Sequence, residues 1–184
     1  MTRFAMLALC LGAQLCSAQS TPSVDLKTLK SKYKQDLAVI QADSDKALTN
    51  SIQGYADALK VLGQKLQGAG DLDGILAVQK ESERFGKEKA IPEGAVVADN
   101  VALRELQLYW QKMPETIDIS KSRKIVALSK GHIAALEAAK KQLTTQGKVE
   151  EAVELKNEIE RLRTSAEVTA AEFILTSSSL DSPP

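Results

Sequence analysis

The chain contains one helical pattern written twice. The copies cover residues 55–85 and 132–162 and share seven of 31 aligned residues, including Gly70/Gly147. We call the constant step between them, which leads from Tyr55 to His132, the repeat offset. Each copy has the features of a helix end, a reversal and a new helix, because glycine readily adopts the left-handed backbone that ends helices. Such a repeat indicates a duplicated supersecondary unit, so we expect an all-α fold of two tandem long helical hairpins, packed as a coiled coil or a helical bundle.

The first long helix is expected over residues 24–67, with Ser23 as its N-cap. Apolar residues recur there at steps of three, four or their sums, which places them on one helix face. This stripe consists of Leu26, Leu29, Tyr33, Leu37, Ile40, Ala47, Tyr55, Leu59, Leu62 and Leu66. Ser44 and Ser51 fill two positions in its middle. The alternative is a break at residues 43–45, whose Asp-Ser-Asp side chains compete for backbone hydrogen bonds.

A short reversal at residues 68–70 follows this helix. Asp71 is a suitable N-cap for a second helix over residues 72–89, which must run antiparallel to the first because the turn is so short. Residues 90–100 contain a proline and a glycine and show no apolar stripe. We expect them to link the two repeats.

The second copy keeps the stripe but places Pro114 where the first has Leu37. Proline removes a helical hydrogen bond, so we expect a kink or a new helix start near Met113. A fourth helix is expected over residues 149–165, and a flexible tail after it, because residues 166–184 lose the helical period. The expected segments are a signal peptide at 1–18, repeat 1 at 19–89, the linker at 90–100, repeat 2 at 101–165 and the tail at 166–184.

Residues 1–18 are organised like a secretory signal peptide. Arg3 gives a positive start, residues 4–15 are largely apolar, and Ala18 is the small residue expected before the cleavage site. An uncleaved anchor is the alternative, but the apolar run would rise only ~18 Å as a helix, against a hydrocarbon core of ~30 Å. We expect cleavage after Ala18 and an exported protein, periplasmic or extracellular, without a membrane span once cleaved.

Both cysteines, Cys10 and Cys16, precede the expected cleavage site. A lipoprotein anchor is a further alternative, but lipobox cysteines usually follow a small residue, and Leu9 and Leu15 precede these two. The mature chain would then contain no cysteine. Disulfides, thiol catalysis and cysteine zinc sites are accordingly not expected.

The charge balance argues against a nucleic-acid partner. The chain has 24 basic and 24 acidic residues, and removal of Arg3 with the leader leaves a net charge of −1 (23 minus 24). Nucleic-acid-binding domains usually carry a basic surplus or stripe. The short basic runs at 121–124 and 140–141 are better explained as solvated helix faces.

The residues that form the reversal resemble a known group of proteins. Tyr-x-x-Ala-Leu at residues 55–59 and the run GDLDGILAVQKESERF at residues 70–85 are similar to a loosely defined set of exported bacterial helical-hairpin repeat proteins of unknown function. The Gly-x-x-x-x-Ala-Leu turn also resembles tetratricopeptide helix pairs, whose period of about 34 residues is less than half the repeat offset here. The first resemblance implies fold and export, and no activity.

The sequence contains no complete set of residues for a metal site or a catalytic site. The Asp-Leu-Asp-Gly run at Asp71 would need further oxygen ligands for calcium, but those positions hold Ile75 and Ser82, and Lys148 replaces Asp71 in the second copy. His132 is the one histidine and lies on the apolar stripe in place of Tyr55. We expect it to stack in the helix seam and to donate one hydrogen bond, rather than to act as a base.

Three other patterns also have structural explanations. The glycines at 68–70 follow a helix, so they are no nucleotide fingerprint. The glutamates of Glu-x-Glu at 81–83 and 158–160 point apart on a helix, and we expect exposed ion pairs of Glu81 with Arg84 and of Glu158 with Arg161 instead. Trp110 occupies the position of inward-facing Tyr33 and is expected to pack in the core. We assign no catalytic, cofactor-binding or metal-binding residue.

The helix lengths bear on partners. A first helix of ~65 Å and a return helix of ~27 Å leave the stripe at residues 26–40 without cover. Residues 103–117 or a second chain, as in a homodimer, could supply that cover. Two functions remain: a non-catalytic interaction or scaffold module with a protein partner, or a structural, self-assembling coiled-coil protein of the cell envelope.

Overall fold

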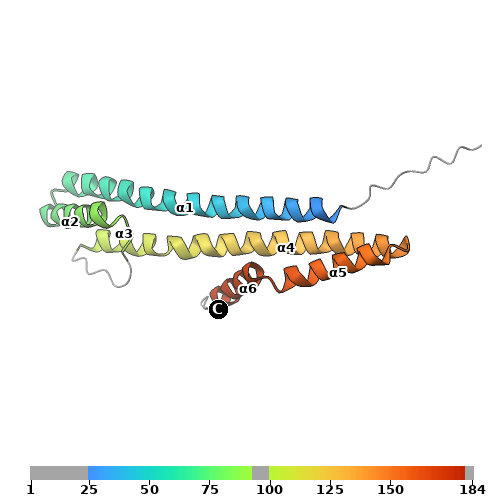
Figure 1. The fold of residues 1–184 in the computed structure, drawn as a ribbon. Helices are drawn as coiled ribbons and strands as arrows, with labels where there is room; N and C mark the ends of the chain where they lie inside the picture. Colours follow the sequence, from blue (N-terminus) through green and yellow to red (C-terminus); the bar gives the residue numbers. More distant parts are fainter. Residues whose placement is uncertain (1–24, 93–99, 181–184) are drawn as a thin grey trace, which may run out of the picture.

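The chain folds into an elongated all-α rod (Figure 1). The computed structural model describes residues 25–92 and 100–180, so the expected signal peptide lies outside the described residues. Within these ranges there are six helices and no strand. They are α1 (Leu26–Gly68), α2 (Leu72–Glu88), α3 (Val101–Gln111), α4 (Met113–Thr145), α5 (Val149–Arg163) and α6 (Ala166–Leu180).

The long first helix is continuous, as predicted. Helix α1 passes without interruption through residues 43–45, so the alternative of a break there is wrong. Its N-cap is Asp25 rather than Ser23: the Asp25 carboxylate accepts hydrogen bonds from the Lys27 amide at 3.0 Å and the Thr28 hydroxyl at 2.6 Å. Ser44 is buried on the stripe, which explains why the helix keeps its phase there.

The two reversals have the same backbone geometry. Gly70 and Gly147 both adopt a left-handed conformation, with φ of 72° and 75°. In the first reversal the Asp71 amide donates to the Leu66 carbonyl at 3.0 Å, the hydrogen bond that defines a Schellman motif. The Lys148 amide makes the same bond in the second, also at 3.0 Å. The predicted hairpins α1–α2 and α4–α5 are thereby confirmed.

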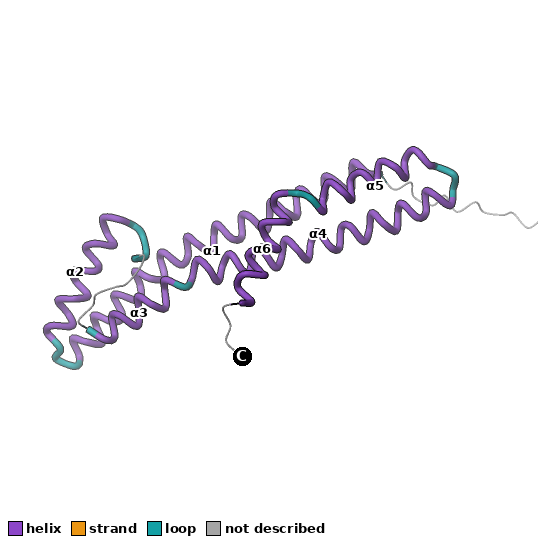
Figure 2. The backbone as a smooth tube through the Cα atoms, turned by 90° about the horizontal axis from the view of Figure 1, so that it is seen from below, coloured by secondary structure: helices purple, strands orange, loops and turns teal. Residues whose placement is uncertain are grey.

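The expected interruption near Met113 is also confirmed. Helix α3 ends at Gln111 and α4 begins at Met113, with Pro114 in its first turn. A proline is tolerated there because the first amides of a helix have no partner within it. Helices α3 and α4 together run antiparallel to α1 (Figures 1 and 2).

The expectation of a flexible tail from residue 166 is wrong for residues 166–180, which form α6. Val168 and Ala171 are buried and Leu175 is partly buried, at spacings of three and four residues that place them on one face. This face packs on α4 at Ile125 and Val126. The helix was missed because its buried face is narrow and includes a small residue.

Each of the two larger cores of the rod is built from both repeats. One core combines Tyr33 of α1 with residues of α4 and α5, and the other combines Tyr55 of α1 with residues of α2 and Leu103 of α3. The expectation that residues 103–117 would cover the stripe at 26–40 is therefore wrong, and the stripe is covered without a second chain. Helices α4 and α5 cover residues 26–37, and Ile40 packs beside α6, because α1 runs alongside the second hairpin.

Residues related by the repeat offset occupy equivalent places at opposite ends of the rod. The stacked pair Tyr33 and His132, with ring centroids 4.9 Å apart, becomes the pair Trp110 and Tyr55, at 6.2 Å. The duplication is thus folded as an antiparallel pair with approximate two-fold symmetry, in which each repeat completes the core of the other.

Candidate functional site

A buried carboxylate lies between α1 and α2. The Tyr55 hydroxyl donates a hydrogen bond to Glu81 Oε1 at 2.6 Å. Arg84 binds both carboxylate oxygens, through Nε to Oε2 at 2.8 Å and Nη2 to Oε1 at 2.7 Å. The glutamate is only 8% exposed, and Tyr55 is fully buried. This arrangement is a bidentate ion pair with one further donor from the long helix.

The surroundings fix the protonation state of both groups. Burial opposes ionisation of Glu81, but the hydrogen bonds from Arg84 and Tyr55 outweigh it and lower the pKa of Glu81. Burial raises the pKa of Tyr55 strongly, and the hydrogen bond to Glu81 raises it further. Near neutral pH the carboxylate therefore stays charged and the phenol stays protonated. A general acid or base works best with a pKa close to the operating pH, which neither group has.

The second repeat holds the equivalent carboxylate, Glu158. Arg161 binds it through Nη2 to Oε1 at 2.6 Å and Nε to Oε2 at 3.0 Å, and Lys30 Nζ of α1 lies 2.9 Å from Oε2. Glu158 is 3% exposed. The hydrogen bonds from Arg161 are the main reason that the pKa of Glu158 is lowered, against the effect of burial.

The predicted ion pairs Glu81–Arg84 and Glu158–Arg161 are confirmed, but the expectation that they are exposed is wrong for the glutamates. Reasoning along one helix missed the donors that α1 contributes across the hairpin. The neighbouring Glu160 turns away and pairs with Arg163 at 3.2 Å. These carboxylates therefore do not form an acid–base pair.

His132 stacks on Tyr33, as expected for a histidine in the helix seam. The rings are inclined by 28°. Its Nε2 is buried and has no hydrogen-bond partner among the residues that the structure describes, so the expected donated bond is not found at that nitrogen. Burial lowers the pKa of His132, although the charge of Glu158 opposes this effect. The ring is held neutral as a packing element.

Trp110 is partly buried and packs against the core, as predicted from its stripe position. Its ring lies edge-on to Tyr55 and beside Gly54 of α1. A Cβ at Gly54 would lie 2.5 Å from Trp110 Cη2, so the indole fits because Gly54 has no side chain. The role of Gly54 depends on the helix that packs against it, so the sequence pattern of α1 does not indicate it.

Asp71 is a helix cap, as predicted. It accepts a hydrogen bond from the Gly74 amide at 2.9 Å and another from Asn100 Nδ2 at 3.2 Å. Over residues 25–92 and 100–180, no three His, Cys, Asp or Glu residues gather closely enough to hold a metal ion. Asp71 therefore serves to join the start of α2 to that of α3.

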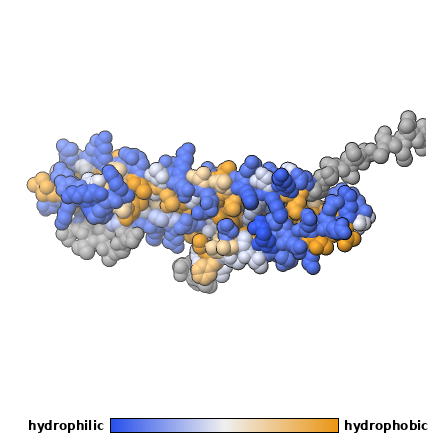
Figure 3. Space-filling model, in the orientation of Figure 1, coloured by the Kyte–Doolittle hydropathy of each residue, from blue (hydrophilic) through white to orange (hydrophobic). Residues whose placement is uncertain are grey.

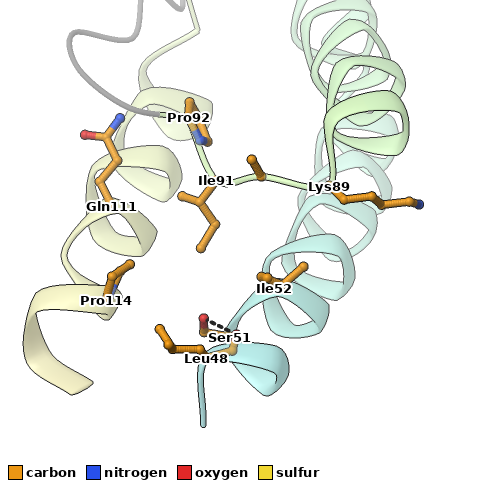
Figure 4. Close-up of a pocket in the computed structure, with 9 residues that line it drawn as sticks. Leu48, Ser51, Ile52, Lys89, Ile91, Pro92, Gln111 and Pro114 are labelled. Carbon is orange, nitrogen blue, oxygen red and sulfur yellow. Dashed lines mark hydrogen bonds between the residues drawn. The ribbon is translucent and has the colours of Figure 1, made fainter. Parts of the chain in front are cut away.

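A pocket of about 580 Å³ lies beside α1, where α2 ends and α4 begins (Figure 4). Its largely apolar lining comes from three segments that are distant in sequence. The lining residues are Leu48, Ser51, Ile52, Lys89, Ala90, Ile91, Pro92, Gln111 and Pro114. Leu48 and Ile52 lie outside the predicted stripe, so the helical pattern alone does not indicate this pocket.

Comparison with known proteins adds no assignment. No protein-family model, curated protein or solved structure matches this chain. Across the part of the chain that the structure describes, no helix combines the length and apolar character that a membrane span requires. The geometry itself must therefore support any functional proposal.

Proposed function

We propose that this chain is a non-catalytic, exported helical repeat protein that acts as an interaction or scaffold module. A repeated pair of exposed apolar residues carries the proposal. Leu72 and Leu76 begin α2 and are 66% and 53% exposed, and Val149 and Val153 begin α5 and are 63% and 48% exposed. The repeat offset carries each member of the first pair onto a member of the second.

These pairs do not serve the cores described above. Single exposed apolar residues are ordinary on protein surfaces, but an i, i+4 pair forms a small patch on one helix face. The fold buries other residues of the same helices, such as Val78 and Leu155. Retention of the exposed pairs in both copies is therefore better explained by contact with another protein.

The two pairs occupy opposite ends of the rod. The turns that precede α2 and α5 lie at its two tips, and apolar surface is visible at both (Figures 1 and 3). Helix α1 alone has 43 residues and spans ~65 Å. A rigid rod with equivalent contacts at its ends can hold two partner molecules at a fixed separation, which is the role of a scaffold.

Export is proposed from the organisation of residues 1–18, and a protein partner from the balanced charge. The absence of catalysis is proposed because the buried carboxylates of Glu81 and Glu158 are neutralised by arginines and are inaccessible to a substrate. A reproducible turnover that His132→Ala abolishes would contradict this part of the proposal.

The alternative is a structural, self-assembling coiled-coil protein. The same tips favour it, because apolar ends can also join to each other. The two functions predict different partners for the same surface: a foreign protein for the scaffold, and further copies of this chain for the self-assembling protein.

The test is capture of partners from the native envelope by the mature chain and by two tip variants, Leu72→Asp/Leu76→Asp and Val149→Asp/Val153→Asp. Val39→Asp on α1, also exposed, is the matched control. Stoichiometric capture of a foreign protein, lost in the tip variants alone, supports the scaffold. Recovery of homopolymer alone supports self-assembly, and capture that is equal for all variants contradicts a role for the tips.

A further inference from the structure

The approximate symmetry of the rod gives the pocket beside α1 a counterpart. Leu48 and Pro114, which line the pocket, are related by the repeat offset to Ile125 and Leu37. Ile125 and Leu37 belong to the cluster on which α6 packs. The pocket is therefore the first repeat's version of the α6 site.

Among the described residues, no helix of the first repeat fills that site, and the sequence there disfavours one. Pro92 and Gly94 occupy the sequence positions of Thr169 and Ala171 in α6. A proline inside a helix removes a hydrogen bond and clashes with the preceding turn, and glycine weakens a helix further. The two segments remain equivalent only as far as Ile91, which lines the pocket. Ile91 corresponds to Val168, a buried residue of α6.

The pocket keeps an apolar character suited to a helix. Figure 4 shows Ile91, Ile52, Leu48 and Pro114 arranged around its space, while the Lys89 side chain points away from it. Its volume of about 580 Å³ lies within the ~300–1,000 Å³ range of binding pockets. The walls formed by α1 and the start of α4 correspond to the walls, formed by α4 and α1, that hold α6.

We propose that this pocket binds an apolar-faced helix of a partner protein. The helix presents small and aliphatic side chains at i, i+3 and i+7, the spacing of Val168, Ala171 and Leu175 in α6. Docking of such a face into a groove is a common mode of recognition. This inference rests on the proposed function, because it specifies the structure of the partner that the module binds.

The probe is a fluorescent synthetic peptide of residues 165–180, added to the full mature chain and followed by anisotropy. We expect saturable binding. Ile52→Asp and Leu48→Asp should each weaken it about tenfold or more, because a carboxylate would be buried without a partner. Ile52 is exposed in the free chain, so its substitution leaves the fold intact, which circular dichroism checks. Val39→Asp is the matched control on α1 and should not change the affinity.

Three results would overturn the inference. They are the absence of saturable binding, binding that Ile52→Asp leaves unchanged, and binding that appears only after residues 95–98 are replaced by Gly-Ser. The last result would mean that the chain's own residues 93–99 occupy the pocket. The tip experiment gives a separate result. If the peptide binds but no partner is captured through the tips, the proposed function alone is contradicted. If a partner is captured through the tips but the peptide does not bind, this inference alone is contradicted.

Discussion

Tyr33 and His132 stack with their ring centroids 4.9 Å apart, although they belong to different repeats. Their counterparts in the repeat alignment, Trp110 and Tyr55, meet edge to face at the other end of the rod. The same two stripe positions are thus in contact twice, once in each direction, with different ring geometries. The duplication is stable as a unit because neither short return helix covers the whole of its long helix, and each repeat supplies the cover that the other lacks.

The hydroxyl of Tyr55 should stabilise the fold through Glu81. Tyr55→Phe removes the 2.6 Å hydrogen bond and leaves one acceptor of a buried carboxylate less well satisfied. We expect a loss of about 1.5–3 kcal/mol in the free energy of unfolding, the range for hydrogen bonds to charged groups. Urea denaturation measures it. Tyr109→Phe, at an exposed tyrosine, should change stability by less than about 0.5 kcal/mol, and equal effects of the two variants would contradict the assignment.

His132 should make stability depend on pH in the acidic range. Burial holds its pKa in the folded state below the ordinary value of 6.5, so the unfolded chain binds a proton first as the pH falls. Stability is therefore full above pH 6.5 and declines from there towards the folded-state pKa. The lowered pKa values of Glu81 and Glu158 act in the same direction, but only below about 4.5.

His132→Tyr isolates this effect, because it restores the residue found at the equivalent position 55. We expect the free energy of unfolding to differ less between pH 7.5 and pH 5.5 in the variant than in the original chain. His132→Phe, which also cannot be protonated, is the control. Urea denaturation at both pH values supplies the measurement, and an unchanged slope in both variants would show that His132 is not responsible.

Gly54 should be required for the packing of Trp110. In Gly54→Ala the new methyl group would lie 2.5 Å from Trp110 Cη2, so the indole must move. We expect destabilisation of about 1–3 kcal/mol from overpacking. Gly131→Ala on α4 is the matched control, since its Cβ meets nothing within 4 Å, and it should stabilise by about 0.5–1 kcal/mol through helix propensity. Thermal unfolding compares them, and stabilisation by both would contradict the contact.

The features that could be predicted from the sequence depend on local signals. The continuous α1, the left-handed glycines 70 and 147, and the restart at Met113 each follow from residues within a turn or two. The features that were missed depend on which segments meet in space. Lys30 reaches Glu158 from another helix, and the buried face of α6 is defined by its packing against Ile125 of α4.

The central claim is that the two repeats interlock within one chain. Lys27 near the start of α1 and Glu154 on α5 are both exposed and line the same hollow. We would replace these two residues by cysteine, attach spin labels and measure the distance between the labels by pulsed electron paramagnetic resonance. The samples would be diluted with unlabelled protein. The account predicts a separation well under half of the ~65 Å length of α1, unchanged by dilution. A separation close to that full length, or a short one that disappears on dilution, would contradict it.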